Sequence, residues 1–308
     1  MNVNDNYIEL RNRNTFGDTI NTYFLFLKFN FKKFTSLYLR YNAVSIIITI
    51  ISSYLLVTGF MGLASRDFRF GMNNDGEDTI YLAVGSVILF LILFITALIN
   101  YSFSSAYITD YVNSTGNVES KHIWQKIIAN IGSIILFILI GIGIYIGYFI
   151  VSFIFALIPL LGMFVQYGLN FLLTAFFGLT FMAIFTENKG LGNAISVGWS
   201  YTFSSFGKVI LFGLVIGILN LMITILIVSV PGFIIGIYVY FSVESNVDLA
   251  TSVFANVIFT LGFAMFILAF IYSQALTQIS YGVLYYNIYE EKNNVFLRNK
   301  IEQIGVND

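Results

Sequence analysis

Long apolar stretches without a charged residue alternate with short polar segments along this chain. The longest, residues 127–186, contains no Asp, Glu, Lys, Arg or His. One membrane crossing needs about 20 apolar residues, so this run fits two crossings joined by a tight turn. Four further uncharged runs lie at 41–65, 79–109, 209–243 and 249–289. A water-soluble domain keeps charge on its surface, so the pattern predicts helices whose solvent is lipid.

These runs predict an all-α fold, a polytopic transmembrane bundle of six spans. We expect one transmembrane domain at residues 18–290, a flexible cytoplasmic tail at 1–17 and a second tail at 291–308. The expected spans are 43–64, 80–103, 130–157, 163–185, 209–230 and 252–273. Because Pro231 interrupts the uncharged run at 209–243 and the part after it is short for a crossing, we expect a kinked extension or an interfacial segment there.

The basic residues predict the orientation of the bundle. With six spans, both termini lie on the same side of the membrane. All but two of the 15 Lys and Arg residues fall on that side, the exceptions being Arg66 and Arg69. Positive residues favour the cytoplasmic side, so both termini are expected in the cytoplasm. The outer loops 66–78 and 244–248 are net acidic.

The chain repeats one plan three times, a cytoplasmic segment followed by a helical hairpin. In the first segment Ile20, Phe24, Leu27, Phe31, Phe34 and Tyr38 follow helical spacing. The basic residues beside this stripe are Lys28, Lys32, Lys33 and Arg40. Such a helix is suited to lie on an anionic membrane surface, and the alternative is that its apolar stripe packs against the bundle.

The plan resembles the six-span membrane region that is fused to some bacterial glycerophosphodiester phosphodiesterases, and stand-alone relatives of that region. The residues behind the resemblance are 190–219, an amphipathic segment rich in Asn, Ala, Ser and Trp, then Phe206-Gly207-Lys208 and a glycine-containing span. This chain has no room for the catalytic barrel of the fused proteins, so phosphodiesterase activity is not implied. The resemblance implies a membrane module in the bacterial cytoplasmic (inner) membrane.

No charged residue interrupts the predicted spans, and this argues against proton-coupled transport through carboxylates and against voltage sensing. The remaining polar candidates within the spans are Gln166, Asn170, Thr174, Asn220 and Asn256. They are candidates for a polar seam that binds a solute or a lipid head group. The alternative is that they only form hydrogen bonds between helices.

Catalytic chemistry has little support in the sequence. Cysteine is absent and His122 is the one histidine, with Glu119 and Glu187 as the nearest acidic candidates. A catalytic site needs a nucleophile or metal partner in a recognisable arrangement, and no motif supplies one. We expect no catalytic residue, cofactor or metal. The net charge of −1 gives no general attraction for nucleic acid.

The sequence therefore favours a non-enzymatic integral membrane protein. It would act as a scaffold or subunit of a membrane complex, or through lipid contact. Its expected partners are membrane lipids and another membrane protein. The alternative is a permease or channel for an uncharged or amphipathic solute, with Asn170, Asn220 and Asn256 lining its cavity. A membrane-embedded lipid enzyme is the third hypothesis.

Overall fold

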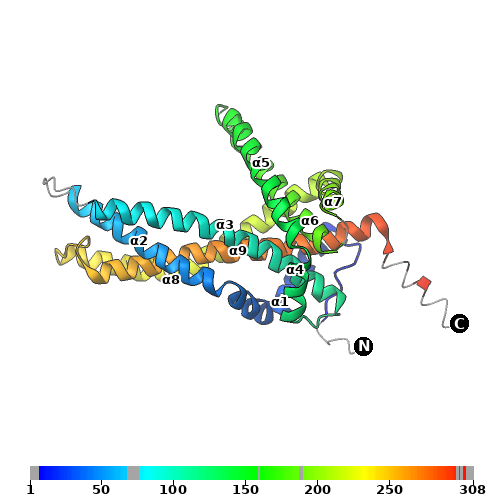
Figure 1. The fold of residues 1–308 in the computed structure, drawn as a ribbon, viewed down its shortest axis with the longest axis horizontal. Coiled ribbons are helices and arrows are strands. Elements are labelled where there is room, and N and C mark those ends of the chain that lie inside the picture. The colour runs from blue at the N-terminus through cyan, green and yellow to red at the C-terminus, as the bar shows by residue number, and fades with distance from the viewer. Residues whose placement is uncertain are drawn as a thin grey trace. The chain divides into compact units, whose positions relative to one another are not determined.

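A computed structural model describes residues 7–67, 76–158, 160–186, 190–295, 298 and 301–302. The described residues are helical with short connections (Figure 1). The helices are α1 (Phe16–Tyr41), α2 (Ala43–Asp67), α3 (Glu77–Asn113), α4 (Ser120–Ala129), α5 (Ile131–Ala156), α6 (Leu161–Thr186), α7 (Leu191–Ser204), α8 (Phe206–Glu244) and α9 (Val253–Asn293). The prediction of an all-α polytopic bundle is confirmed.

The element order repeats the same plan three times. Helices α1, α4 and α7, here called the leading helices, are each followed by two long helices (Figure 1). A single residue separates each leading helix from the next helix: Asn42, Asn130 and Ser205. The carbonyl of that residue accepts the first backbone bond of the long helix in all three places, at 2.8, 3.0 and 2.9 Å. Local backbone geometry is therefore repeated even where side chains differ.

Six helices in the described residues are long and apolar enough to cross a membrane: α2, α3, α5, α6, α8 and α9. The protein is therefore a multi-pass membrane protein. Helices α3, α8 and α9, with 37, 39 and 41 residues, extend well beyond the expected spans. Pro231 lies inside α8, so the stretch after it is an extension of the same helix. Proline has no backbone N–H, so Pro231 removes only one hydrogen bond from α8. The other backbone N–H and C=O groups find no alternative partner in lipid and keep their helical hydrogen bonds.

The chain forms two compact units. Unit 1 contains residues 1–38, 100–218 and 275–308, and unit 2 contains residues 39–99 and 219–274. Helices α3, α8 and α9 therefore contribute residues to both.

In unit 1, an aromatic face joins α1 to α3. Phe26 meets Tyr111 edge to face with ring centroids 4.9 Å apart, and Phe34 meets Tyr107 at 5.2 Å. Both phenylalanines are fully buried. Such edge-to-face pairs add to the gain from burial because the positive edge of one ring meets the negative face of the other.

The centre of unit 1 is the meeting of α3, α6 and α9. A Cβ placed on Gly178 of α6 would lie 2.8 Å from the Tyr281 ring of α9, so only glycine permits this approach. The amide nitrogen of Gln278 donates to Ser105 Oγ at 2.7 Å and to the Gly178 carbonyl at 3.0 Å. One buried amide therefore connects all three helices.

In unit 2, α2 and α3 approach closely at Gly59 and Gly62. The backbone carbonyl of Asp78 lies 2.7 Å from the position of a Cβ on Gly59, and the Asp78 carboxyl group lies against Gly62. Helices α2 and α9 are joined by Asn256, whose amide nitrogen donates to Thr58 Oγ1 at 2.9 Å. Close approach and one polar pair therefore organise this unit.

The segment before α1 differs from the expected flexible tail. Leu10 is buried, and the Ile8 amide donates to the Tyr111 hydroxyl at 2.7 Å. Burial also raises the pKa of the Tyr7 phenol, which donates to Glu9. These residues pack because Tyr111 gives the chain an aromatic and a polar contact together. Residues 1–6 of the expected tail lie outside the described part, as do most residues after 295.

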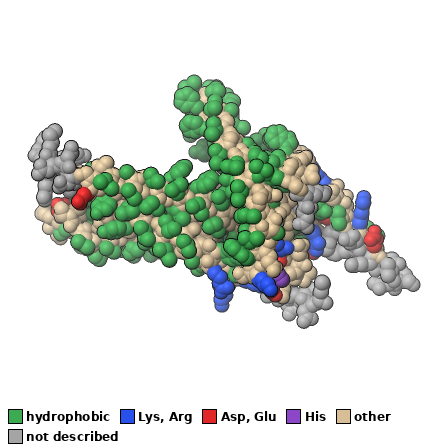
Figure 2. All heavy atoms as spheres, in the orientation of Figure 1, with side chains coloured by type: hydrophobic (Ala, Val, Ile, Leu, Met, Phe, Trp, Pro, Cys, Tyr) green, Lys and Arg blue, Asp and Glu red, His purple; other side chains and the backbone are tan. Residues whose placement is uncertain are grey.

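Large apolar surfaces remain exposed in both units. Figure 2 shows hydrophobic side chains over the visible face of α2 and α3, with Lys and Arg side chains near α1 and α4. In unit 1, no residue of α5 after Gly141 is buried. An apolar surface of this extent is expected where lipid replaces water as solvent.

Candidate functional site

The predicted basic helix is α1, and the structure corrects which of its faces is packed. The buried residues of α1 are Thr19, Tyr23, Phe26, Asn30, Phe34 and Tyr38. Two members of the predicted stripe, Phe24 and Phe31, are instead 46% and 51% exposed. The packed face is rotated because Phe26 meets the Tyr111 ring of α3.

This rotation leaves an aromatic edge beside the basic residues. Lys28, Lys32, Lys33 and Arg40 are all exposed. Phe24 and Phe31 lie on the side of α1 that carries Lys28 and Lys32, by helical spacing. The helix therefore packs against unit 1 and still presents apolar and cationic groups outward. The packing alternative raised from the sequence therefore applies to the buried face of α1.

The other two leading helices present apolar stripes that sequence reasoning missed. On α4 the exposed residues of the stripe are Trp124, Ile128 and the adjoining Ile131 of α5. On α7 they are Trp199, Phe203 and the adjoining Phe206 of α8. The spacing of four and then three residues is the same in both, so the signal was present in the sequence.

The first leading helix departs from this pattern. Counting back from Asn42 as from Asn130 and Ser205, the corresponding positions hold Ser36, Arg40 and Ala43, which are exposed. The two tryptophans of the chain, Trp124 and Trp199, therefore mark equivalent positions in the second and third repeats, and are 56% and 58% exposed.

The polar residues predicted on α6 make local hydrogen bonds. Gln166 donates to the Ser152 carbonyl of α5 at 2.8 Å, and Thr174 donates to the Asn170 carbonyl within α6 at 2.8 Å. The Asn170 residue itself is exposed. The first of these hydrogen bonds joins α6 to α5, and the second lies within α6.

The two remaining predicted residues lie in unit 2. Asn220 is buried, and its carbonyl accepts from Thr224 in the same helix. Asn256 pairs with Thr58, and its side-chain oxygen also accepts from Thr260 at 3.3 Å. The described hydrogen bonds of Asn220 and Asn256 therefore lie within one helix or join two helices.

A polar recess in unit 1 joins the end of α3 to α4. The Asp110 carboxylate is buried and accepts the Glu119 amide at 3.2 Å. His122 Nδ1 and Lys126 Nζ lie 3.7 and 3.8 Å from Asp110 Oδ1. Sequence reasoning had considered His122 and Glu119 but had missed Asp110, which reaches them through the turn at Thr115 and Gly116, both with positive φ. Glu187 lies outside the described residues.

This recess has a volume of about 490 Å³ and is bordered also by Asn113, Ser114, Gln125 and Ala129. Asp110 serves as a counterion and as the anchor of the turn before α4. Within the described residues, no cluster of His, Cys, Asp or Glu is arranged to hold a metal ion.

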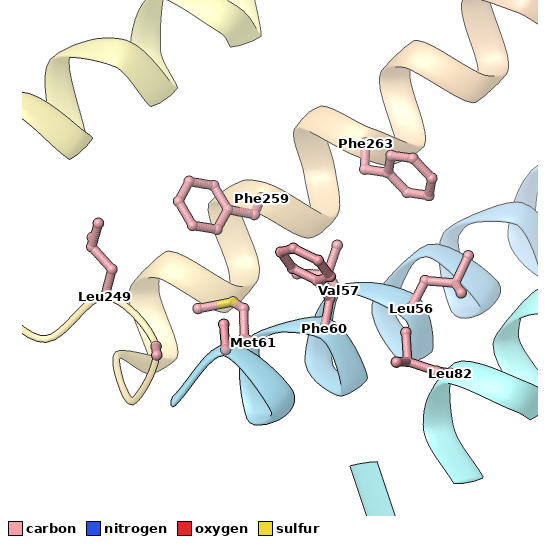
Figure 3. A pocket seen from close by; sticks show the side chains of 10 residues that line it. Leu56, Val57, Phe60, Met61, Leu82, Leu249, Phe259 and Phe263 are labelled. Atoms are coloured by element: carbon pink, nitrogen blue, oxygen red, sulfur yellow. The ribbon is translucent and has the colours of Figure 1, made fainter. Parts of the chain in front are cut away.

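An apolar cavity of about 560 Å³ lies in unit 2 (Figure 3). Helix α2 contributes Leu56, Val57, Phe60, Met61 and Ala64. The other lining residues are Leu82 of α3, Leu249 and Ala250 of the loop after α8, and Phe259 and Phe263 of α9. The side chains of Phe60, Met61, Leu249 and Phe259 face a common space (Figure 3). None of the predicted polar-seam residues borders it.

Comparison with known proteins gives this chain no relative: no family model, no curated protein and no solved structure matches it.

Proposed function

We propose that this multi-pass membrane protein is non-enzymatic and acts through lipid contact, as a scaffold or subunit of a membrane complex. The observation that carries the proposal is the repeated exposed stripe on α4 and α7, headed by Trp124 and Trp199. Tryptophan favours the boundary between lipid and water, and a helix with one apolar face lies in that boundary. The leading helices would then rest at the head-group level of the cytoplasmic leaflet. A bacterial cytoplasmic membrane and cytoplasmic termini belong to the same proposal.

Tryptophan fluorescence tests this placement directly, because the chain has only these two tryptophans. Trp199→Phe leaves Trp124 as the reporter, and Trp124→Phe leaves Trp199. In nanodiscs with lipids brominated at different chain depths, we expect both reporters to be quenched most by bromine near the head group. Quenching by aqueous acrylamide alone, with no effect of brominated lipid, would contradict the proposal.

A matched control comes from a neighbouring face of α4. Gln125 is exposed and borders the polar recess. In a chain with both tryptophans replaced by Phe, Gln125→Trp places a reporter one residue from Trp124 but on another face. We expect brominated lipids to quench it much less. Equal quenching at both positions would mean that α4 has no preferred lipid face.

The exposed basic residues of α1 would select anionic lipids. Each Lys near an anionic leaflet contributes about 1 kcal/mol of attraction to it, and this attraction decays over about one Debye length. Lys28→Gln and Lys32→Gln should each lower the number of anionic lipids retained in native mass spectrometry, while Lys28→Arg should preserve it. Unchanged retention in the Gln variants would leave α1 without a lipid-selecting role.

The scaffold part of the proposal is supported by the exposed portion of α5. A Cβ atom placed on Gly143 or Gly147 would meet no heavy atom within 4 Å, so the surface at both glycines is open to lipid or to another helix. Purification in mild detergent should therefore recover a stoichiometric membrane-protein partner. A monomer that retains only lipid would restrict the proposal to lipid contact.

The alternative function is a permease for an amphipathic solute. The apolar cavity of unit 2 favours it, because an apolar cavity of this size matches the range of small-molecule sites. Reconstituted vesicles loaded with an amphipathic fluorescent solute provide the test. Flux that depends on the protein would favour the permease over the scaffold.

A further inference from the structure

The apolar cavity of unit 2 is built from the ends of its helices that adjoin two loops. Phe60, Met61 and Ala64 belong to the last turns of α2, and Leu82 belongs to the first turns of α3. Leu249 and Ala250 come from the loop between α8 and α9. By the predicted topology, this end adjoins the outer leaflet.

Water is a poor occupant of this cavity. All ten lining residues are Leu, Val, Phe, Met or Ala, and a buried water needs two to four polar partners. Phe60 lines the cavity and is 68% exposed, so the cavity reaches the lipid-facing surface. Hydrocarbon can therefore enter from the membrane and make the contacts that an empty space would forgo.

The described residues near this end of unit 2 are rich in carboxylates. Glu77 and Asp78 begin α3, Glu244 ends α8, and Asp248 lies in the loop before α9. Asp78 lies one turn before the lining residue Leu82, and Asp248 immediately precedes Leu249. A head group held here would lie in a net negative field, which disfavours an anionic head and favours one with an amine.

We propose that unit 2 binds one acyl chain of a phospholipid with an amine-bearing zwitterionic head group. The acyl chain fills the apolar cavity, and the head group lies beside the carboxylates of Asp78 and Asp248. This binding goes beyond the lipid contact proposed for the leading helices, because it uses other residues and disfavours the anionic head groups that α1 would select.

Photocrosslinking of the full-length protein in nanodiscs tests the proposal. The probes are a phosphatidylethanolamine and a phosphatidylglycerol that carry the same diazirine-bearing acyl chain. We expect the ethanolamine lipid to label residues 56–64 and 259–263 several times more strongly than the glycerol lipid. Labelling spread evenly over the exposed apolar faces would contradict binding of the acyl chain in the cavity. Equal labelling by both probes would contradict selection of the head group.

A pair of variants separates the cavity from ordinary surrounding lipid. Ala64→Phe fills the cavity, whereas Ala83→Phe adds the same side chain on the exposed face of α3. We expect Ala64→Phe to lower labelling of 259–263 about tenfold, the effect of excluding roughly two methylene groups. Ala83→Phe should leave it unchanged.

Ala250→Phe fills the same cavity from the loop between α8 and α9. It replaces Ala64→Phe in the experiment if that variant does not give a monodisperse protein. Undiminished labelling in a well-folded filling variant would overturn the proposal.

Discussion

Helices α3, α6 and α9 of unit 1 meet at Gly178 and Gln278, whereas unit 2 joins α2 to α9 by Thr58 and Asn256 beside an apolar cavity. Lipid tails are as apolar as the side chains, so helices in a membrane associate through packing and hydrogen bonds. Both units have both features, but unit 2 also keeps a space that another apolar molecule can fill. We therefore expect the stability of unit 1 to depend on its tight packing and buried amide more strongly than that of unit 2 depends on its polar pair.

The strongest way to break this comparison is to enlarge Gly178. In Gly178→Leu the new side chain must displace Tyr281, whose ring and Cβ both lie within 3.0 Å of the Cβ position. We expect a loss of about 3 kcal/mol in the free energy of unfolding, as for severe overpacking. A denaturant titration in mixed micelles, followed by circular dichroism, measures it.

Gly143→Leu is the matched control, because nothing lies within 4 Å of the same position in α5. We expect its free energy of unfolding to stay within about 0.5 kcal/mol of the unchanged protein. Equal losses in both variants would mean that helix insertion, rather than packing in unit 1, decides the result.

A smaller effect is expected from the amide at the centre of unit 1. Gln278→Leu removes the bonds to Ser105 and to the Gly178 carbonyl. In the described structure the buried side-chain oxygen of Gln278 has no hydrogen-bond partner, which destabilises the folded protein. Removing this oxygen therefore offsets part of the free energy that is lost with the two bonds. We expect a net destabilisation of about 1–2 kcal/mol in the same titration. Gln166→Leu, which removes one half-buried bond, should cost less, and the reverse order would contradict the comparison.

Hydropathy and charge predicted much of the fold because both are properties of short stretches of sequence. The six apolar helices and the continuation of α8 past Pro231 follow from the need to satisfy the backbone in lipid. Hydropathy and charge did not predict which face of α1 is packed. Phe24 and Phe26 are equally apolar, and only contact with Tyr111 distinguishes the buried ring from the exposed one.

The polar sites were harder to predict because they depend on contacts between distant residues. Gln278 lies beyond the last expected span, 252–273, yet it is buried by α3 and α6. Asp110 ends an uncharged run and faces His122 only because of a turn with two positive φ angles. The spacing that unites Trp124 with Trp199 was visible in the sequence, but which side faces outward depends on Ile123 and Ala194 being buried.

The smallest expected effect comes from the polar pair of unit 2. Asn256→Leu removes the bond to Thr58 at 2.9 Å and the bond from Thr260 at 3.3 Å. The hydroxyls of Thr58 and Thr260 can then each donate to a carbonyl of their own helix, as threonine does in helices, so little is left unsatisfied. We expect a loss of about 0.6 kcal/mol, the average for such pairs in a membrane. Asn170→Leu, at an exposed position of α6, serves as the control and should not destabilise the protein. If Asn256→Leu costs as much as Gln278→Leu, then unit 2 depends on its polar pair as strongly as unit 1 depends on its amide, and the proposed division between them fails.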